Sequence, residues 1–186
     1  WQDNDASLAL TTTPKWTNNS RLGAGAYEFD YKQVFYPKNL GIRDNLTLSA
    51  WVKLNSIRES GFIQSDYFFS TDSTGRLRAY WYGTSNQGYH ISPNALTVGV
   101  WTHVVAVWDG SYCILYENAT EVKRVATTTP GRATTGYVAF GTEGNATPLN
   151  STRRLDGSLD DIRIYASALT AAQVQELYQT RASLDD

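Results

Sequence analysis

The chain has 186 residues, of which 41% are hydrophobic, 13% aromatic and only 18% charged, and its formal net charge at pH 7 is -2. This length suits one domain with a buried core, so we expect a single domain over residues 1–186. The lack of a basic run argues against a nucleic-acid partner, and the lack of an apolar run of roughly 18 residues argues against membrane insertion.

Short β-like segments follow one another along the chain, with turn signals between them. Strands are expected at Ala26–Asp30, Leu46–Leu54, Phe62–Gln64, Tyr67–Thr71, Arg76–Tyr82, Gly88–Ile91, Trp101–Trp108, Tyr112–Glu117, Glu121–Ala126, Tyr137–Gly141 and Leu159–Tyr165. The second of these alternates apolar and polar residues, which predicts a half-buried antiparallel strand. Its core-facing residues would be Leu46, Leu48, Ala50, Val52 and Leu54, and Thr47, Ser49, Trp51 and Lys53 would face away. The pattern predicts an all-β antiparallel sandwich of about ten to twelve strands.

The strand expected at Arg76–Tyr82 has an apolar face and an aromatic, cationic face. Alternation directs Leu77, Ala79 and Trp81 toward the core. Sugar rings stack on Trp and Tyr, and their hydroxyls need polar partners. The candidate ligand-binding residues are therefore Trp51, Arg78, Tyr80, Tyr82, Tyr89 and His90, with Asp66, Tyr67 and Asn86 in loops at the rim. The alternative is that Tyr-rich strands simply cover an antiparallel sheet.

One short helix is expected at the end of the chain. Thr170 fits the N-cap, and Gln173 completes a capping box. Leu169 and Val174 would form a hydrophobic staple across this cap. The helix is too short to be stable by itself, so we expect its apolar face to pack on a sheet in a structural role.

The sequence also carries signals of an extracellular protein. Five Asn-x-Ser/Thr sequons occur, at Asn18, Asn45, Asn118, Asn145 and Asn150. They favour a secreted or surface-displayed glycoprotein, and the alternative is a Thr- and Asn-rich β surface without glycans. Cys113 is the only cysteine, which excludes an internal disulfide and a Cys-based zinc site.

Five segments together resemble a known family. They are Gly25–Asp30, Leu46–Lys53, Trp101–Gly110, Leu115–Val122 and Leu155–Leu169, and they run in the family order over about residues 25–178. The chain thereby resembles the laminin G-like, concanavalin A-like jelly-roll domains (the LamG-like group). The resemblance implies an antiparallel jelly-roll β-sandwich with one short C-terminal helix, but the fold hosts many functions.

Two residues depart from the family pattern. Tyr31 stands where the family often has Gly, and Ala119 stands where Asn-Gly would make a tight turn. Because Ala disfavours positive φ, we expect a different or longer turn after Asn118.

Glycoside hydrolases of this broad fold use paired carboxylates, in one group arranged as E-x-D-x-x-E on one strand. The nearest approach here is Glu28-x-Asp30-x-x-Gln33, which lacks the third carboxylate. No nucleophile elbow supports a triad with His90 or His103, and His103 matches a structural His of the family strand. We therefore expect no catalytic residues.

The resemblance also implies a structural Ca²⁺ that ties the first strand to the last. Asp160 matches the ligand position in the last strand, Asp30 would complement it, and Asp161 is the weaker candidate because neighbouring strand residues point to opposite faces. The alternative is that both acids cap the turn or pair with Arg163 or Arg153.

These observations favour a non-catalytic extracellular recognition module that binds a carbohydrate or glycoprotein, stabilised by Ca²⁺. The alternative is an adhesion or structural domain of a surface protein that makes protein–protein contacts, through self-association or within a larger parent protein. A glycoside hydrolase is disfavoured by the missing carboxylate.

Overall fold

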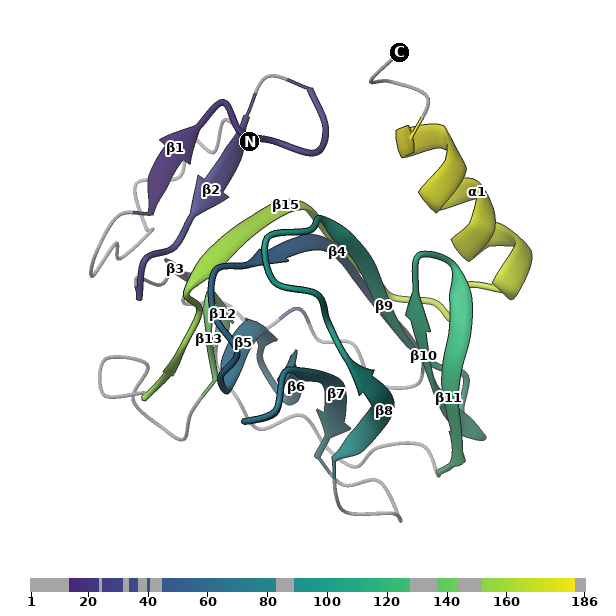
Figure 1. The fold of residues 1–186 in the computed structure, drawn as a ribbon. Coiled ribbons are helices and arrows are strands. Elements are labelled where there is room, and N and C mark those ends of the chain that lie inside the picture. Colours follow the sequence, from purple (N-terminus) through teal and green to yellow (C-terminus); the bar gives the residue numbers. More distant parts are fainter. Residues whose placement is uncertain are drawn as a thin grey trace.

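Two antiparallel β-sheets packed face to face make up the fold, and one helix lies outside them (Figure 1). The computed structural model describes residues 14–23, 25–31, 34–36, 40, 45–82, 89–127, 137–143 and 152–182. The jelly-roll β-sandwich with a C-terminal helix is thus confirmed within these residues.

The larger sheet has seven strands, in the order β1-β2-β15-β4-β9-β10-β11. They are β1 (Lys15–Thr17), β2 (Ala26–Glu28), β15 (Gly157–Tyr165), β4 (Leu46–Leu54), β9 (Thr102–Trp108), β10 (Tyr112–Glu117) and β11 (Thr120–Ala126). The smaller sheet has six strands, in the order β3-β12-β5-β6-β7-β8. They are β3 (Val34–Tyr36), β12 (Val138–Phe140), β5 (Ser60–Gln64), β6 (Tyr67–Thr71), β7 (Arg76–Trp81) and β8 (His90–Ala95). A separate pair is formed by β13 (Thr142–Glu143) and β14 (Arg153–Arg154).

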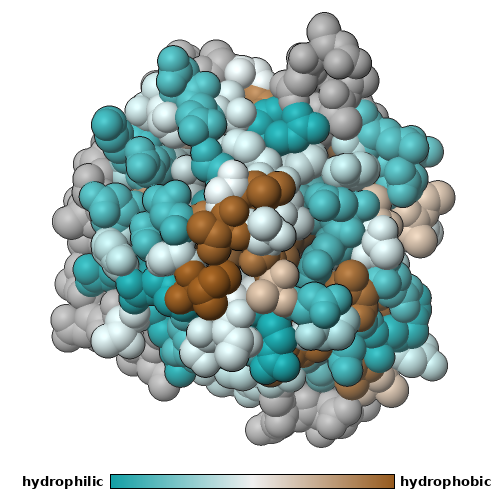
Figure 2. All heavy atoms as spheres, viewed as in Figure 1, coloured by the Kyte–Doolittle hydropathy of each residue, from teal (hydrophilic) through white to brown (hydrophobic). Residues whose placement is uncertain are grey.

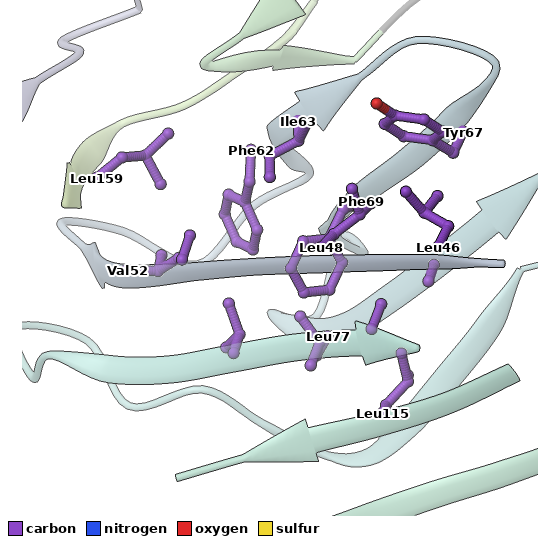
Figure 3. Close-up of a cluster of buried hydrophobic side chains, with 14 of the residues drawn as sticks. Leu46, Leu48, Val52, Phe62, Ile63, Tyr67, Phe69, Leu77, Leu115 and Leu159 are labelled. Atoms are coloured by element: carbon purple, nitrogen blue, oxygen red, sulfur yellow. The ribbon is translucent and has the colours of Figure 1, made fainter. Parts of the chain in front are cut away.

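The core fills the space between the two sheets (Figure 3). The apolar set predicted for β4 is confirmed, because every member of it is buried in this core. From the opposite sheet, Phe62 and Phe69 meet edge to face, with ring centroids 5.9 Å apart. Trp81 of β7 crosses to Trp108 of β9 at 5.4 Å, which fixes the two sheets against each other.

The outer face of β4 is buried as well, except at the partly exposed Lys53, so the prediction of a half-buried strand is wrong. Thr47 and Ser49 are fully buried, and Trp51 is only 2% exposed. The cause is a cover from distant parts of the chain. Tyr178 stacks on Trp51 with ring centroids 5.6 Å apart, and the Arg21 guanidinium lies 4.5 Å from the Trp51 ring.

Helix α1 (Ala171–Ala182) supplies much of this cover and begins as predicted. The Thr170 N–H donates to Gln173 Oε1 at 2.9 Å, and the Gln173 N–H donates to Thr170 Oγ1 at 3.2 Å, which confirms the capping box. Val174 is fully buried and belongs to a second apolar cluster with Val105 and Val107 of β9. Packing of this one face therefore holds the helix on the sheet.

The β10–β11 turn consists of Asn118 and Ala119, with φ values of 48° and 61°. The prediction of a different or longer turn is therefore wrong. The Asn118 N–H donates to His103 O at 2.8 Å, and Asn118 Oδ1 accepts from the His103 N–H at 2.9 Å. Ala119 also packs against the second apolar cluster. These contacts offset the cost of a left-handed Ala.

Ala119→Gly is expected to raise the free energy of unfolding by about 0.5–1 kcal/mol, because Gly adopts positive φ without a Cβ clash. Urea denaturation followed by tryptophan fluorescence measures this change. Ala126→Gly in the adjacent strand is the matched control and should lower stability, because it only adds chain entropy to the unfolded state. A loss of stability in both variants would mean that Ala119 is not strained.

Candidate functional site

The outward side of β6 and β7 carries a cluster of four rings, which we call the aromatic face: Phe68, Tyr80, Tyr82 and Tyr89. Leu77, Ala79 and Trp81 of β7 are buried in the core as predicted, so the residues between them point outward. Phe68 is the register partner of Tyr80, and their rings stack with centroids 5.9 Å apart.

The tyrosines form the accessible edge of the aromatic face. Tyr80 contacts Tyr82 at 5.0 Å in a T-shaped arrangement and Tyr89 at 5.5 Å. Phe68 is buried beneath them, whereas Tyr82 is 39% exposed. The surface therefore presents rigid, partly exposed rings over an apolar base, which suits stacking against a flat ligand.

Next to the aromatic face lies a closed group of four charges, which we call the ion-pair ring: Glu59, Arg78, Glu143 and Arg153. Arg78 Nη1 lies 3.0 Å from Glu59 Oε1, and Arg78 Nη2 lies 3.0 Å from Glu143 Oε1. Arg153 Nε lies 2.7 Å from Glu59 Oε2, and Arg153 Nη1 lies 2.7 Å from Glu143 Oε1. Each guanidinium thus bridges both carboxylates. Arg78 and Glu143 are buried, and the other two are partly exposed.

Tyr89 joins the ion-pair ring to the aromatic face. Its hydroxyl donates to Glu143 Oε1 at 2.5 Å, and its ring lies 4.2 Å from the Arg78 guanidinium. Burial raises the pKa of Tyr89, and the hydrogen bond to Glu143 raises it further, so the phenol stays protonated as a donor. The orientation of this ring is therefore set by two buried charged side chains.

The other end of the aromatic face reaches the β5–β6 turn. The Tyr82 N–H donates to Asp66 O at 2.9 Å, so Asp66 lies beside Tyr82, although it is buried. Tyr67, also expected at the rim, is buried in the core, and Asn86 lies outside the described residues. Gln64 Nε2 donates to the Tyr137 hydroxyl at 2.9 Å and places another phenol here. Burial raises the pKa of Tyr137, and the nearby Tyr82 and Asp66 raise it further.

The structure brings together four of the six predicted ligand-binding residues and separates two. Arg78, Tyr80, Tyr82 and Tyr89 meet on one surface. His90 is the register partner of the core residue Ala79, so its side chain points between the sheets and is 5% exposed. Trp51 belongs to the other sheet and is covered by Tyr178. Placing Trp51 and His90 on this surface was therefore wrong.

Sequence reasoning missed Glu59 and Glu143 as members of the site. Glu143 lies in the two-residue strand β13, which has no alternation to recognise. Arg153 was considered only as a partner for the acids of β15, and it pairs with Glu59 and Glu143 instead. The one available signal was Arg78 itself, since a cation on a β face next to aromatic residues needs a carboxylate when it is buried.

The two acids proposed for calcium do not converge. Leu159 is the register partner of Tyr27, whereas the Tyr31 N–H donates to Leu155 O. Asp30 therefore lies roughly 13 Å further along the strand than the position opposite Asp160. Among the residues described, no group of three or more His, Cys, Asp or Glu side chains is arranged to hold a metal ion.

Asp160 instead binds backbone N–H groups. Its Oδ2 accepts from Arg21 at 3.0 Å and Leu22 at 2.8 Å, and its Oδ1 accepts from Asp161 at 2.8 Å. These three N–H donors occupy three of the roughly four lone-pair sites of the carboxylate. Asp160 thus ties the N-terminal segment to β15 directly, and Asp161 pairs with Arg163 Nε at 2.9 Å, as the alternative interpretation held.

Asp160→Asn is expected to lower the free energy of unfolding by about 1–3 kcal/mol, because the amide places its own N–H₂ group against backbone donors. Thermal melting with added Ca²⁺ and with EDTA measures the effect, which should be equal in both. Asp30→Asn is the control and should not change the melting temperature. If EDTA lowers the melting temperature of the unmodified chain but not of Asp160→Asn, Asp160 is a calcium ligand after all.

The structure also places the other residues discussed for chemistry. Asp30 follows β2 with a φ of 31°, so strand alternation does not put its carboxylate on one face with that of Glu28, and Gln33 lies outside the described residues. His103 Nε2 lies 2.9 Å from Ser49 Oγ, but both residues are fully buried. The prediction of a packed, hydrogen-bonded His103 is confirmed.

Three sequons fall on described residues. Asn18, Asn45 and Asn118 are all exposed, whereas Asn145 and Asn150 lie outside the described residues. Their use for glycosylation stays a prediction. In the described part of the chain, no helix is both long and apolar enough to cross a membrane.

The chain is similar to known proteins in both sequence and fold. The family described as the concanavalin A-like lectin/glucanases superfamily (Laminin_G_3) matches residues 25–175. No curated protein sequence matches the chain.

Solved structures with the same fold include several with ligand-binding descriptions. A native heptameric SAP-like pentraxin from Limulus polyphemus is 20% identical, with a TM-score of 0.65, and the match covers 89% of this chain and 80% of the pentraxin. Domain 4 of AbnA, a GH43 extracellular arabinanase from Geobacillus stearothermophilus, was solved in complex with arabinotriose. It is 20% identical, with a TM-score of 0.65 and coverage of 90% and 82%.

The binding domain of Paraclostridial Mosquitocidal Protein 1 is also similar. It is 15% identical, with a TM-score of 0.70, and the match covers 93% of this chain but only 47% of that domain. At these identities the likenesses show the fold and not the ligand.

Proposed function

The chain belongs to the concanavalin A-like lectin/glucanases superfamily, and from this premise we propose that it is a non-catalytic, extracellular carbohydrate-binding module. Its ligand would lie on the aromatic face. The observation that carries the proposal is the set of partly exposed tyrosines stacked on Phe68 beside a polar ion-pair ring. Such a surface offers both the stacking faces and the hydrogen-bonding groups that sugar rings require.

The neighbours support this function by their descriptions. The arabinanase domain was solved with arabinotriose, and another similar structure is described as a putative carbohydrate binding protein. Affinity for a single site of this kind would be modest, since only stacking and a few hydrogen bonds contribute, and repetition within a larger protein would raise it. A catalytic role lacks support, because the carboxylates at the site are engaged by guanidinium groups.

One observation favours the alternative of protein–protein contact. Ile57, Val98 and Val100 are exposed, and the Gly99 N–H donates to Leu54 O, which brings the β8–β9 connection against the end of β4. Figure 2 shows hydrophobic atoms gathered at the centre of one face, where Figure 1 draws this connection. Nothing in the structure selects an occupant for this surface, so carbohydrate binding remains the better supported function.

Tyr82→Ala is expected to weaken glycan binding about two- to tenfold, because one lost aromatic stacking contact corresponds to roughly 0.5–1.5 kcal/mol. A glycan array identifies a ligand, and isothermal titration measures its affinity for each variant. Tyr112→Ala is the matched control, since Tyr112 on the other sheet is 40% exposed against 39% for Tyr82.

If both variants weaken binding equally, or if neither weakens it, the ligand does not bind at the aromatic face. An array without any bound glycan, together with self-association measured by analytical ultracentrifugation, would instead favour the protein-contact alternative.

A further inference from the structure

The charges around the aromatic face add up to a slightly negative surface. The ion-pair ring contributes two guanidinium groups and two carboxylates, and each guanidinium already bridges both carboxylates. Asp66, beside Tyr82, adds one further carboxylate. The formal charge of these described residues is therefore -1, and neither cation of the ring is left over for an anionic ligand.

The raised pKa values of the tyrosine hydroxyls also indicate a negative electrostatic field at this surface. Burial raises the pKa of Tyr82 most, and Tyr80, Glu143 and Asp66 raise it further. Asp66 raises the pKa of Tyr137 as well. At Tyr89, Arg78 and Arg153 partly offset the effect of Glu143. A negative field at the exposed hydroxyls disfavours a second negative charge brought against them.

The sequence next to these residues adds little positive charge. The segment between Tyr82 and Tyr89 reads Gly-Thr-Ser-Asn-Gln-Gly, and the segment 144–151 reads Gly-Asn-Ala-Thr-Pro-Leu-Asn-Ser, so neither contains a charged residue. The segment 128–136 before Tyr137 contains one, Arg132. Counting it would make the balance neutral and still not positive.

Resting on the proposed function, we infer that the ligand of the aromatic face is an uncharged glycan, and that the face discriminates against sugars carrying a carboxylate or sulfate. Sugar hydroxyls can donate to Glu59 and accept from Arg153, the two partly exposed members of the ring. An anionic sugar would have to displace Glu59 or Glu143 from Arg153 and would leave that carboxylate with Arg78 as its one remaining partner in the ring. Specificity then comes from the cost imposed on the wrong ligand as well as from contacts with the right one.

The test is a glycan array that holds each neutral oligosaccharide beside its sialylated, uronic-acid or sulfated counterpart. The acidic member of a bound pair should bind at least about fivefold more weakly, the factor expected for two unit charges held close together in water. Raising NaCl from about 50 mM to about 500 mM should leave binding of the neutral glycan unchanged and improve binding of its acidic counterpart, because salt screens repulsion.

Glu59→Gln supplies a variant of the same site with one negative charge fewer. It should narrow the preference for the neutral member of the pair. Glu121→Gln is the matched control, because Glu121 is also partly exposed and paired to an arginine, Arg124, but on the other sheet. It should leave the preference unchanged.

The outcomes separate the two proposals. Equal or tighter binding of acidic counterparts, or affinity for them that falls with salt, would overturn the charge discrimination while carbohydrate binding stands. An array with no bound glycan would overturn the proposed function itself, and the inference with it.

Discussion

Glu143→Gln is expected to lower the free energy of unfolding by about 3–5 kcal/mol, the cost typical of removing one partner from a buried ion pair. Glu143 Oε1 accepts from Arg78 Nη2, Arg153 Nη1 and the Tyr89 hydroxyl. Without its charge, the buried Arg78 guanidinium keeps only Glu59 as a counter-ion, and the new amide N–H₂ group faces other donors. Urea denaturation measures the loss, and near-ultraviolet circular dichroism reports the loosened Tyr89 ring.

Glu121→Gln is the control for this variant as well. Its pair with Arg124 is exposed, so its loss should cost less than about 1 kcal/mol. The double variant Arg78→Met/Glu143→Leu should be more stable than Glu143→Gln, because it removes the buried cation together with its partner. Equal costs for Glu143→Gln and Glu121→Gln would contradict a stabilising role of the ion-pair ring.

The alternation of residues predicted faces well, because a strand has a fixed period of two. It assigned the core sides of β4 and β7 correctly, and with them the outward direction of Tyr80. Alternation does not say which sheet a strand joins or what covers its outer side. Trp51 points outward as expected, but its partner Tyr178 comes from the end of the chain and covers it.

The ion-pair ring lay beyond sequence reasoning for a related reason. Glu59 precedes β5, Arg78 lies in β7, and Glu143 and Arg153 face each other across the two-residue strands β13 and β14. Such short strands carry no periodic signal, and their pairing is decided by tertiary contacts. In the β10–β11 turn, tertiary contacts likewise override local preference. The hydrogen bonds of Asn118 with His103 outweigh the unfavourable positive φ of Ala119.

The calcium prediction identified the right connection, and calcium itself stays a prediction. A link between the N-terminal segment and the last strand was expected, and Asp160 makes it. The carboxylate accepts hydrogen bonds directly from the N–H groups of Arg21 and Leu22. The sequence pattern identifies Asp160 as a linking acid in the last strand. The distance between Asp160 and Asp30, however, follows only from the register of β2 against β15.

Lowering the pH from about 6.5 to about 4 is expected to cost the fold about 3 kcal/mol through His103 alone. His103 is fully buried, with its ring 5.2 Å from Trp51 and 5.9 Å from Tyr178, and Arg163 lies near. Burial, and then the charge of Arg163, lower its pKa from 6.5 to about 4. Between pH 6.5 and pH 4, His103 is therefore protonated in the unfolded chain and neutral in the folded chain. The free energy of unfolding falls as the pH falls through this window, and the loss levels off below pH 4, where His103 is protonated in both states.

The comparison of the unmodified chain with His103→Gln isolates this effect, because carboxylates and His90 titrate alike in both. His103→Gln costs stability at pH 7 by removing a packed ring, but its deficit relative to the unmodified chain should shrink by about 3 kcal/mol between pH 7 and pH 4. Urea denaturation at several pH values measures it. Stability curves that run parallel across this window would mean that His103 accepts its proton in the folded state, and that the stack of Trp51, His103 and Tyr178 opens readily to water.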